Sequence, residues 1–300
     1  MALRRGLAGW LARHVVRPGL APRLPLAVRR RRTERAARLL PLPRGVRQVP
    51  ASDENPGGEW LLPPGVQAGC PRGAVLYVHG GGFVLGSTVS HRGIAAWLAR
   101  LSGLPVLLAH YRLAPEHPFP AGLEDLQSAW RRLSLDSARP VGLAGDSAGG
   151  WLALALAGYA AGAGLPAPSG LALFSPLVDL AEAERDGDAD TDALLPAGFV
   201  TEGVRAWRGG IPAGDPRFDL LGAPGAGLPP LFVAFDRDEL LAPGARRLVA
   251  AARAGGGPVR VEETVGLWHV WPMFAGLLPE AGATLRAAAA MLVPAPGPRD

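Results

Sequence analysis

The chain has 300 residues, of which 48% are hydrophobic and 19% charged, so it can bury the core of one large globular domain. It contains no lysine, which excludes a Walker A phosphate-binding loop and a lysine Schiff base. A single cysteine, Cys70, excludes an intramolecular disulfide and favours a reducing, cytoplasmic location. With one cysteine, six histidines and no H-E-x-x-H motif, we expect no metal and no zinc site.

The net charge of +5 is distributed unevenly along the chain. Residues 1–47 carry 13 arginines and one acid, Glu34, which leaves 18 of the 31 basic and 25 of the 26 acidic side chains for the rest. The N-terminal arm is therefore basic, and the body of the protein is acidic. Because the arm lacks the spaced aromatic residues of a single-strand binder, we expect no nucleic-acid partner.

The arm, residues 1–45, contains two segments of apolar residues and arginines, Leu3–Val16 and Leu24–Leu40. They predict amphipathic helices that are broken near Pro18, Pro22 and Pro25. We expect the arm to pack as part of a cap over the body, although its arginines would also allow weak contact with an anionic membrane surface. No apolar run is long enough for a signal peptide or a membrane span.

Short apolar runs predict eight strands, at 46–50, 59–62, 74–78, 105–111, 141–144, 171–174, 230–235 and 259–265. Helices are predicted between or after them, at 90–101, 121–133, 151–163, 199–208, 242–254 and 273–292. This alternation predicts the α/β class, with a mostly parallel eight-stranded sheet and helices on both faces. Residues 179–213, which include a patternless acidic run, are expected to be an insertion that forms the second part of the cap. The core then comprises residues 46–178 and 214–300.

The sequence Gly-Asp-Ser-Ala-Gly-Gly at 145–150 contains the pattern G-x-S-x-G. It follows a predicted strand and precedes a predicted helix, which is the context in which this pattern forms a nucleophile elbow. Such a turn exposes the hydroxyl of Ser147 above the sheet, beside a helix N-terminus that favours developing negative charge. We therefore expect Ser147 to be a catalytic nucleophile.

A serine nucleophile requires a base and an acid that orients the base. His269 follows the last predicted strand, where the chain order Ser…Asp…His places the base. Asp238 lies just after the preceding strand and is the expected acid. Asp236 and Glu239 are close by, so spacing alone does not decide among the three carboxylates. We expect Asp236 to brace the turn.

The predicted strand at 74–78 runs into His-Gly-Gly-Gly-Phe at 79–83. Glycines at these positions allow backbone N–H groups to approach a ligand without interference from a Cβ atom. We expect an oxyanion hole formed by the N–H groups of Gly81, Gly82 and Ala148. His79 and Asp146 are expected to brace this loop.

Five motifs in order resemble the bacterial hormone-sensitive-lipase family of α/β-hydrolases. They are HGGGF at 79–83, YRLAPEHPFPA at 111–121, GDSAGG at 145–150, DEL at 238–240 and HVW at 269–271. The resemblance runs from about residue 74 to 273. It implies an α/β-hydrolase fold with a two-part helical cap and a carboxylesterase that needs no cofactor. It also implies the triad Ser147, Asp238 and His269.

The expected activity is hydrolysis of small, apolar, short- to medium-chain acyl esters. Some arginine-rich actinobacterial members that this chain resembles open monoterpene lactones, so a lactone substrate remains an alternative. A ligand receptor on this scaffold is a third hypothesis, and the presence of His269 argues against it, because the plant gibberellin receptor that resembles this family lacks that histidine. A homodimer is also left open. The acidic segment 181–192 and the residues 217–220 depart from the family pattern near the cap, which weakens any inference about the substrate.

Overall fold

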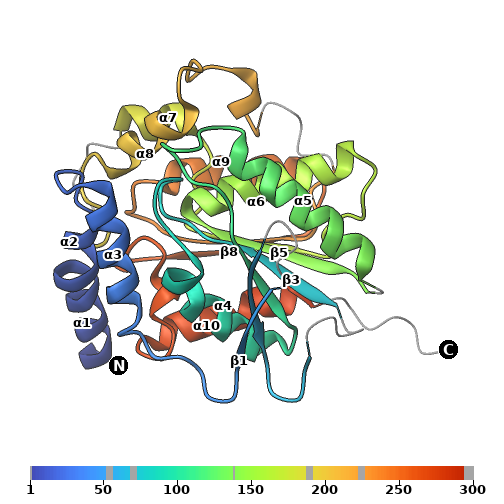
Figure 1. Ribbon diagram of the computed structural model, residues 1–300, viewed down its shortest axis with the longest axis horizontal. Coiled ribbons are helices and arrows are strands. Elements are labelled where there is room, and N and C mark those ends of the chain that lie inside the picture. The colour runs from blue at the N-terminus through green and yellow to red at the C-terminus, as the bar shows by residue number, and fades with distance from the viewer. Residues whose placement is uncertain are drawn as a thin grey trace.

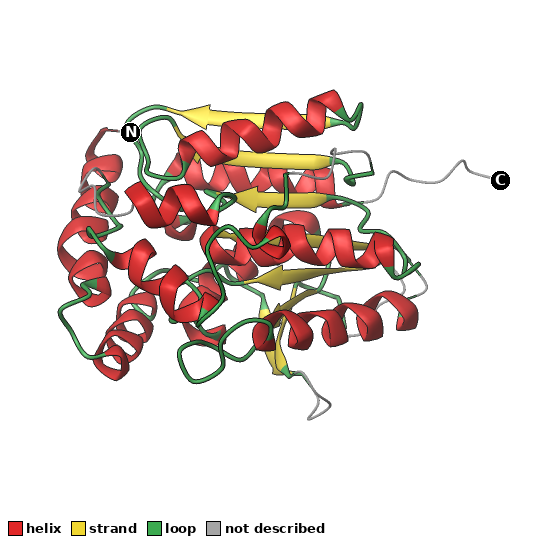
Figure 2. Ribbon diagram, turned by 90° about the horizontal axis from the view of Figure 1, so that it is seen from above, coloured by secondary structure: helices red, strands yellow, loops and turns green. Residues whose placement is uncertain are grey.

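A twisted eight-stranded sheet runs through the middle of the molecule (Figures 1 and 2). The structure is a computed structural model that describes residues 2–51, 57–67, 73–137, 139–186, 192–221 and 227–293. The strands are β1 (Arg47–Pro50), β2 (Gly58–Leu62), β3 (Ala74–Val78), β4 (Val106–Ala109), β5 (Val141–Asp146), β6 (Leu171–Phe174), β7 (Leu231–Asp236) and β8 (Val259–Thr264). Their order is β1-β2-β4-β3-β5-β6-β7-β8. β2 runs antiparallel to both of its neighbours, and all other pairs are parallel.

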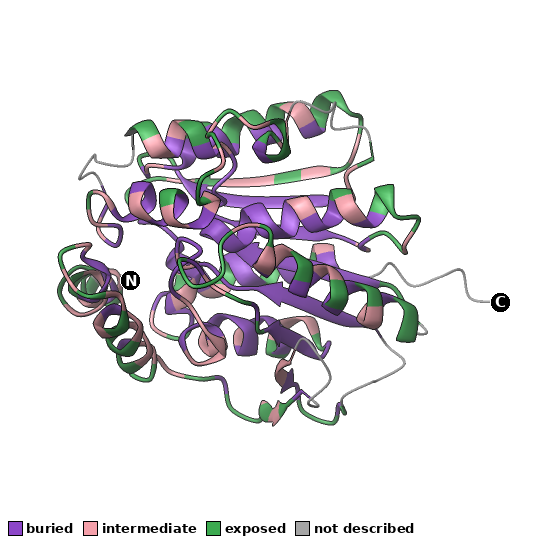
Figure 3. Ribbon diagram, turned by 45° about the horizontal axis from the view of Figure 1, so that its top comes forward, coloured by how far each residue is buried: buried purple, intermediate pink, exposed green. Residues whose placement is uncertain are grey.

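Burial of the strands follows their position in the sheet. Every residue of β3, β4, β5, β6 and β7 is buried, whereas the edge strand β8 is only partly buried (Figure 3). Central parallel strands are covered on both faces, so they read as continuous apolar runs rather than as alternating patterns. For this reason most ends of the central strands were predicted to within one or two residues.

Helices cover both faces of the sheet (Figures 1 and 2). On one face α4 (Thr88–Ser102) packs against α10 (Pro279–Leu292), and the other face carries α5 (Ala121–Asp136), α6 (Ser147–Gly162) and α9 (Ala242–Ala254). The helix predicted at 273–292 begins later than expected. A 3₁₀ turn at Trp271–Phe274 precedes α10, which starts at a proline that needs no backbone N–H partner in the first turn.

The N-terminal arm forms one side of the cap and comprises α1 (Ala2–Leu11), a π-helical turn (Ala12–Val16), α2 (Arg17–Leu20) and α3 (Leu26–Ala37). The break expected near Pro18, Pro22 and Pro25 lies at Pro22 and Pro25, between the end of α2 at Leu20 and the start of α3 at Leu26, and not at Pro18. Helical conformation continues to Leu20, because Pro18 lies in the first turn of α2 and the π-helical turn before it accommodates the change of path.

The second part of the cap contains α7 (Leu180–Asp186) and α8 (Phe199–Arg208), with residues 187–191 outside the described part of the chain. Part of the acidic run that was expected to be patternless is helical. It is stabilised by pairing, because Glu184 contacts both Arg205 and Arg208 of α8. An ion pair between Arg29 of α3 and Glu202 of α8 joins the two parts of the cap.

Candidate active site

Ser147 lies at the sharp turn between β5 and α6, with a φ angle of +51°. A left-handed backbone conformation is unfavourable for a residue with a Cβ, so the surrounding structure must hold it in place. Gly149 makes this possible, since a Cβ at that position would overlap the carbonyl oxygens of Val78 and His79 at the end of β3. The first turn of α6 is therefore packed directly against the loop that follows β3.

In the loop after β3, contacts of the backbone carbonyls fix the orientation of the peptide planes and therefore the direction of the N–H groups. The Gly81 carbonyl accepts hydrogen bonds from the N–H groups of Val84 and Leu85. In a trans peptide the N–H of the next residue points the opposite way, so the N–H of Gly82 points out of this turn. The Gly80 carbonyl lies 2.9 Å from Nδ1 of His79, which turns the N–H of Gly81 away from the His79 ring. Gly81 lines the same cavity as Ser147.

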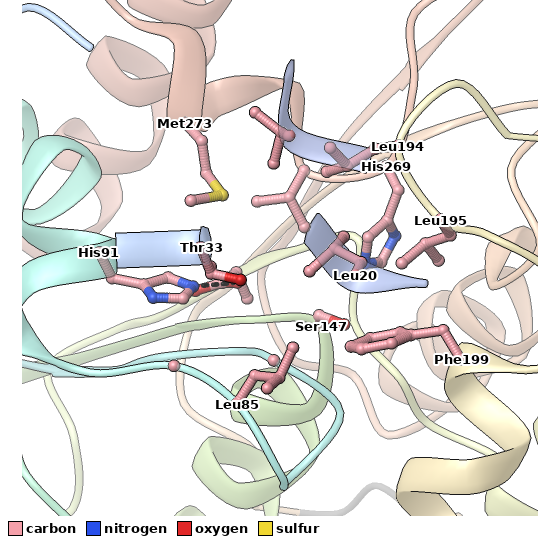
Figure 4. Close-up of a pocket in the computed structure, with 15 residues that line it drawn as sticks. Leu20, Thr33, Leu85, His91, Ser147, Leu194, Leu195, Phe199, His269 and Met273 are labelled. Carbon is pink, nitrogen blue, oxygen red and sulfur yellow. Dashed lines mark ion pairs between the residues drawn. The ribbon is translucent and has the colours of Figure 1, made fainter. Parts of the chain in front are cut away.

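A buried polar network supports this loop from below. Asp146 accepts hydrogen bonds from the hydroxyl of Tyr77 at 2.8 Å and from the N–H of Gly80 at 3.1 Å. Its other carboxylate oxygen lies 3.3 Å from Nε2 of His91 (dashed line in Figure 4). Burial would raise the pKa of Asp146, but His91 and the Tyr77 hydrogen bond outweigh burial and hold it below its ordinary value.

His79 is stacked between the rings of His91 and Tyr111, with ring centroids 5.3 and 4.3 Å away. Burial, followed by the neighbouring His91, lowers the pKa of His79 to about 3, so its ring is neutral at physiological pH. The Tyr111 hydroxyl donates to the His79 carbonyl at 2.7 Å. These contacts agree with the expectation that His79 and Asp146 brace the loop.

His269 follows β8, and its ring lines the cavity together with Ser147 (Figure 4). It is almost completely buried. Neither ring nitrogen has a hydrogen-bond partner within the part of the chain that the structure describes. Nδ1 lies 3.6 Å from Oε2 of Glu239, the carboxylate that faces it.

The expectation that Asp238 faces His269 is not met, and the structure corrects it. Asp238 is exposed, and its backbone N–H donates to Oδ1 of Asp236. Asp236 also accepts from the hydroxyl of Thr264 and the N–H of Leu267, both at 2.8 Å, so it braces the turn as expected. The turn fixed in this way directs Asp238 outward and Glu239 inward. Glu239 was one of the rival carboxylates, and its position one residue beyond Asp238 was the only sequence signal for it.

Glu239 is held in place by Ser175, which follows β6. The Ser175 hydroxyl donates to Oε2 of Glu239 at 2.8 Å and accepts from the N–H of Val270 at 2.9 Å. Burial raises the pKa of Glu239, although its contacts with His269 and Ser175 oppose this shift. Burial alone would lower the pKa of His269, but the carboxylates of Glu239 and Asp192 outweigh burial and raise it above its ordinary value of 6.5.

Asp192, in the second part of the cap, is a residue that the sequence did not single out. Its Oδ2 accepts the backbone N–H of His269 at 2.8 Å, and its Oδ1 accepts the N–H groups of Leu194 and Leu195. It is buried, and it joins the cap directly to the loop of His269. It lies within an acidic run in which no pattern distinguishes it from its neighbours.

The cavity above Ser147 is mainly apolar. The arm contributes Val16, Leu20 and Thr33, and the rest of the wall includes Leu85, Leu194, Leu195, Phe199, Val270 and Met273 (Figure 4). α8 packs on the glycine loop itself, because a Cβ on Gly203 would overlap the carbonyl oxygen of Gly82. Both parts of the cap therefore contact the site.

The sheet order, the turn that carries Ser147 and the histidine after the last strand define a hydrolase with the α/β-hydrolase fold. The chain belongs to this family: the family model described as alpha/beta hydrolase fold matches residues 75–273. The resemblance to esterases of the hormone-sensitive-lipase type is thereby confirmed, and the protein is a serine carboxylesterase-like hydrolase.

The relatives agree with this class. An acetyl-hydrolase from Streptomyces hygroscopicus is 38% identical over 230 residues, covering 74% of this chain and 76% of the relative. An esterase from Acinetobacter venetianus is 33% identical, covering 69% of this chain and 70% of the relative. A solved esterase of the bacterial hormone-sensitive lipase family superimposes with a TM-score of 0.86 at 30% identity, covering 97% of this chain and 98% of that one.

Proposed function

We propose that this hydrolase cleaves esters of short, apolar acyl groups through an acyl-enzyme on Ser147, with His269 as the base and Glu239 as the acid. The observation that carries the proposal is the shared cavity. Ser147, at its strained turn, faces the same space as Gly81 of the glycine loop and the ring of His269. No other buried carboxylate among the described residues forms an ion pair with that ring.

In the first half of the reaction, Oγ of Ser147 attacks the ester carbonyl carbon while Nε2 of His269 takes the hydroxyl proton. The carbonyl oxygen becomes an oxyanion, which accepts hydrogen bonds from the N–H groups of Gly81, Gly82 and Ala148. His269 then returns the proton to the leaving alcohol. In the second half, water replaces the serine hydroxyl as the nucleophile and releases the carboxylic acid.

Glu239 supports both halves by stabilising the imidazolium form of His269 through its charge 3.6 Å from Nδ1. Because Glu239 and His269 are both buried, solvent screens this interaction only weakly. A carboxylate in this position also favours the tautomer that leaves Nε2 without a proton. These are the two roles of the acid in such a triad.

The cavity favours short acyl chains. Its volume is about 60 Å³. Apolar side chains from both parts of the cap, among them Leu20, Leu195 and Phe199, line this small space and leave little room for a long chain. The name of the acetyl-hydrolase relative also supports a short acyl group.

A series of p-nitrophenyl esters from acetate to decanoate tests this proposal. We expect the highest kcat/KM between acetate and butyrate, and a fall of at least about tenfold by octanoate, because the longer chain must displace cap residues or remain exposed. Inactivation by a serine-reactive phosphonate, with Ser147→Ala as the control, tests the acyl-enzyme. A maximum at octanoate or beyond would contradict the size argument.

The lactone alternative is tested in the same assay with a seven-membered lactone. If the lactone is hydrolysed faster than every ester, the proposed substrate class changes from esters to lactones and the proposed mechanism stays the same. If no ester and no lactone reacts, the proposed function is wrong.

A further inference from the structure

We infer that the outer face of α1 binds an anionic lipid bilayer and places the cap against the membrane surface. Three large apolar side chains point away from the molecule here: Leu3 is 89% exposed, Leu7 53% and Trp10 54%. Their spacing of four and three residues puts them on one face of the helix. We call them the α1 stripe.

The opposite face of α1 is fixed to the body. Ala8 and Ala12 are fully buried, and Gly9 lies against the Trp268 ring, so a Cβ on Gly9 would be 3.5 Å from that ring. The Arg5 guanidinium donates to the carbonyls of Val265 and Gly266. Since these contacts hold α1 in one orientation, the exposure of the α1 stripe is a fixed feature of the fold rather than the result of a loosely attached helix.

The surroundings of the α1 stripe are basic. Arg4 and Arg13 are both exposed on the same stretch of helix. Residues 2–33 contain nine arginines and no carboxylate, and of these arginines Arg29 and Arg30 are paired with Glu202 and Glu116. An amphipathic helix with large apolar residues on one side and arginines beside them is suited to the boundary between lipid headgroups and acyl chains. The positive charge selects an anionic surface.

A second copy of the chain fits the α1 stripe less well than a bilayer does. In a two-fold symmetric contact the same patch meets itself, so Arg4 and Arg13 of one copy would face the same residues of the other. Within the described residues, no helix is long and apolar enough to cross a membrane. The contact we infer is therefore with the surface of the bilayer.

Membrane contact at α1 would bring the acyl cavity close to the bilayer. Val16, the last residue of the π-helical turn that follows α1, and Leu20, the last residue of α2, line that cavity. Figure 1 shows α1, α2 and α3 together on one side of the sheet, and Figure 3 shows many exposed residues on the helices beside the N-terminus. Trp268, which contacts α1, is the neighbour of His269 in the chain.

Flotation with vesicles of phosphatidylcholine, with or without phosphatidylglycerol, tests the inference. We expect binding only when phosphatidylglycerol is present. Leu3→Ser combined with Leu7→Ser should lower the partition coefficient at least about tenfold. Arg4→Gln combined with Arg13→Gln should lower it roughly 25-fold, since each arginine near such a surface contributes about fivefold.

Two control variants make the test specific. Leu135→Ser removes a similarly exposed leucine, 59% exposed, from α5 at the other side of the molecule and should not change binding (Figure 1). Arg4→Lys with Arg13→Lys keeps the charge and should retain binding. Circular dichroism checks the fold of every variant, so the result is independent of ester hydrolysis and of the proposed function.

Three results would overturn the inference. One is the absence of binding to vesicles that contain phosphatidylglycerol. Another is binding that disappears in high salt but does not change when the α1 stripe carries the serine substitutions. Such binding would indicate charge attraction alone. The third is a dimer in solution that the same serine substitutions dissociate, which would assign the α1 stripe to a second copy of the chain.

Discussion

Replacing Glu239 with glutamine should nearly abolish turnover, whereas replacing Asp238 with asparagine should not. The two substitutions make the same chemical change at adjacent positions, so each controls for the other. Glu239 is buried against His269, and Asp238 is exposed on the outside of the same turn.

The size of the effect follows from the geometry. Two unit charges 3.6 Å apart in a site of effective dielectric constant about 20 interact by about 4–5 kcal/mol. Removing one charge therefore lowers the rate roughly 10³-fold, since each ~1.4 kcal/mol changes a rate tenfold. An amide also favours the wrong imidazole tautomer, so we expect a total loss in kcat of roughly 10³- to 10⁴-fold. Asp238→Asn should change kcat by less than about threefold, because an exposed charge is screened by solvent.

The pH profile of kcat/KM distinguishes an electrostatic role of Glu239 from a purely structural one. The base must be neutral, so activity of the unmodified enzyme should rise with pH through an apparent pKa above 6.5, the ordinary value of histidine. In Glu239→Gln that apparent pKa should fall, because burial still lowers the pKa of His269 and the main opposing carboxylate is gone.

The assay is hydrolysis of p-nitrophenyl acetate from pH 5 to 9, with the thermal midpoint measured for each variant. If Asp238→Asn loses activity and Glu239→Gln keeps it, the acid is Asp238 and the turn has a different arrangement during catalysis. If Glu239→Gln loses activity with an unchanged pH profile, Glu239 has a structural role alone.

Three further predictions concern the nucleophile, the cap and the cavity wall. Ser147→Ala should reduce ester hydrolysis by roughly 10⁴- to 10⁶-fold at an unchanged thermal midpoint, and near-normal turnover would refute its role as the nucleophile. Asp192→Ala leaves the N–H of His269 without its acceptor, so kcat should fall roughly 10- to 100-fold, as expected for a loss of about 1–3 kcal/mol. The apparent pKa of His269 in the pH profile of this variant should also fall. A change in KM alone would argue against a positioning role for Asp192. Met273→Ala enlarges the cavity and should move the preferred acyl chain toward hexanoate in the ester series, whereas an unchanged preference would place the acyl group elsewhere.

The site shows where sequence reasoning succeeds and where it stops. The turn at Ser147 and the glycine loop at Gly81, which line one cavity, were predicted because neighbouring residues encode each of them. The carboxylate that faces His269 was missed by one residue. In a tight turn, neighbouring side chains point in different directions, and here Asp236 fixes those directions through hydrogen bonds to Thr264 and Leu267. Those partners lie about 30 residues away in the chain, so no local pattern reports them.

The same limit applies to the cap. Asp192 reaches His269 across 77 residues of sequence, and the acidic residue Glu184 acquires its role by pairing with arginines of α8. From composition and order alone, such carboxylates cannot be told apart from solvated surface charges.

The sequence by itself determined the order and type of the central elements, the turn of the nucleophile and the glycine loop, because apolar runs, glycines and prolines act on the backbone next to them. Only the tertiary structure decided that Glu239 faces His269, how large the cavity is and that the α1 stripe remains exposed. Each of these depends on which segments, distant in the chain, are brought into contact, and such contacts are set by the packing of the whole fold.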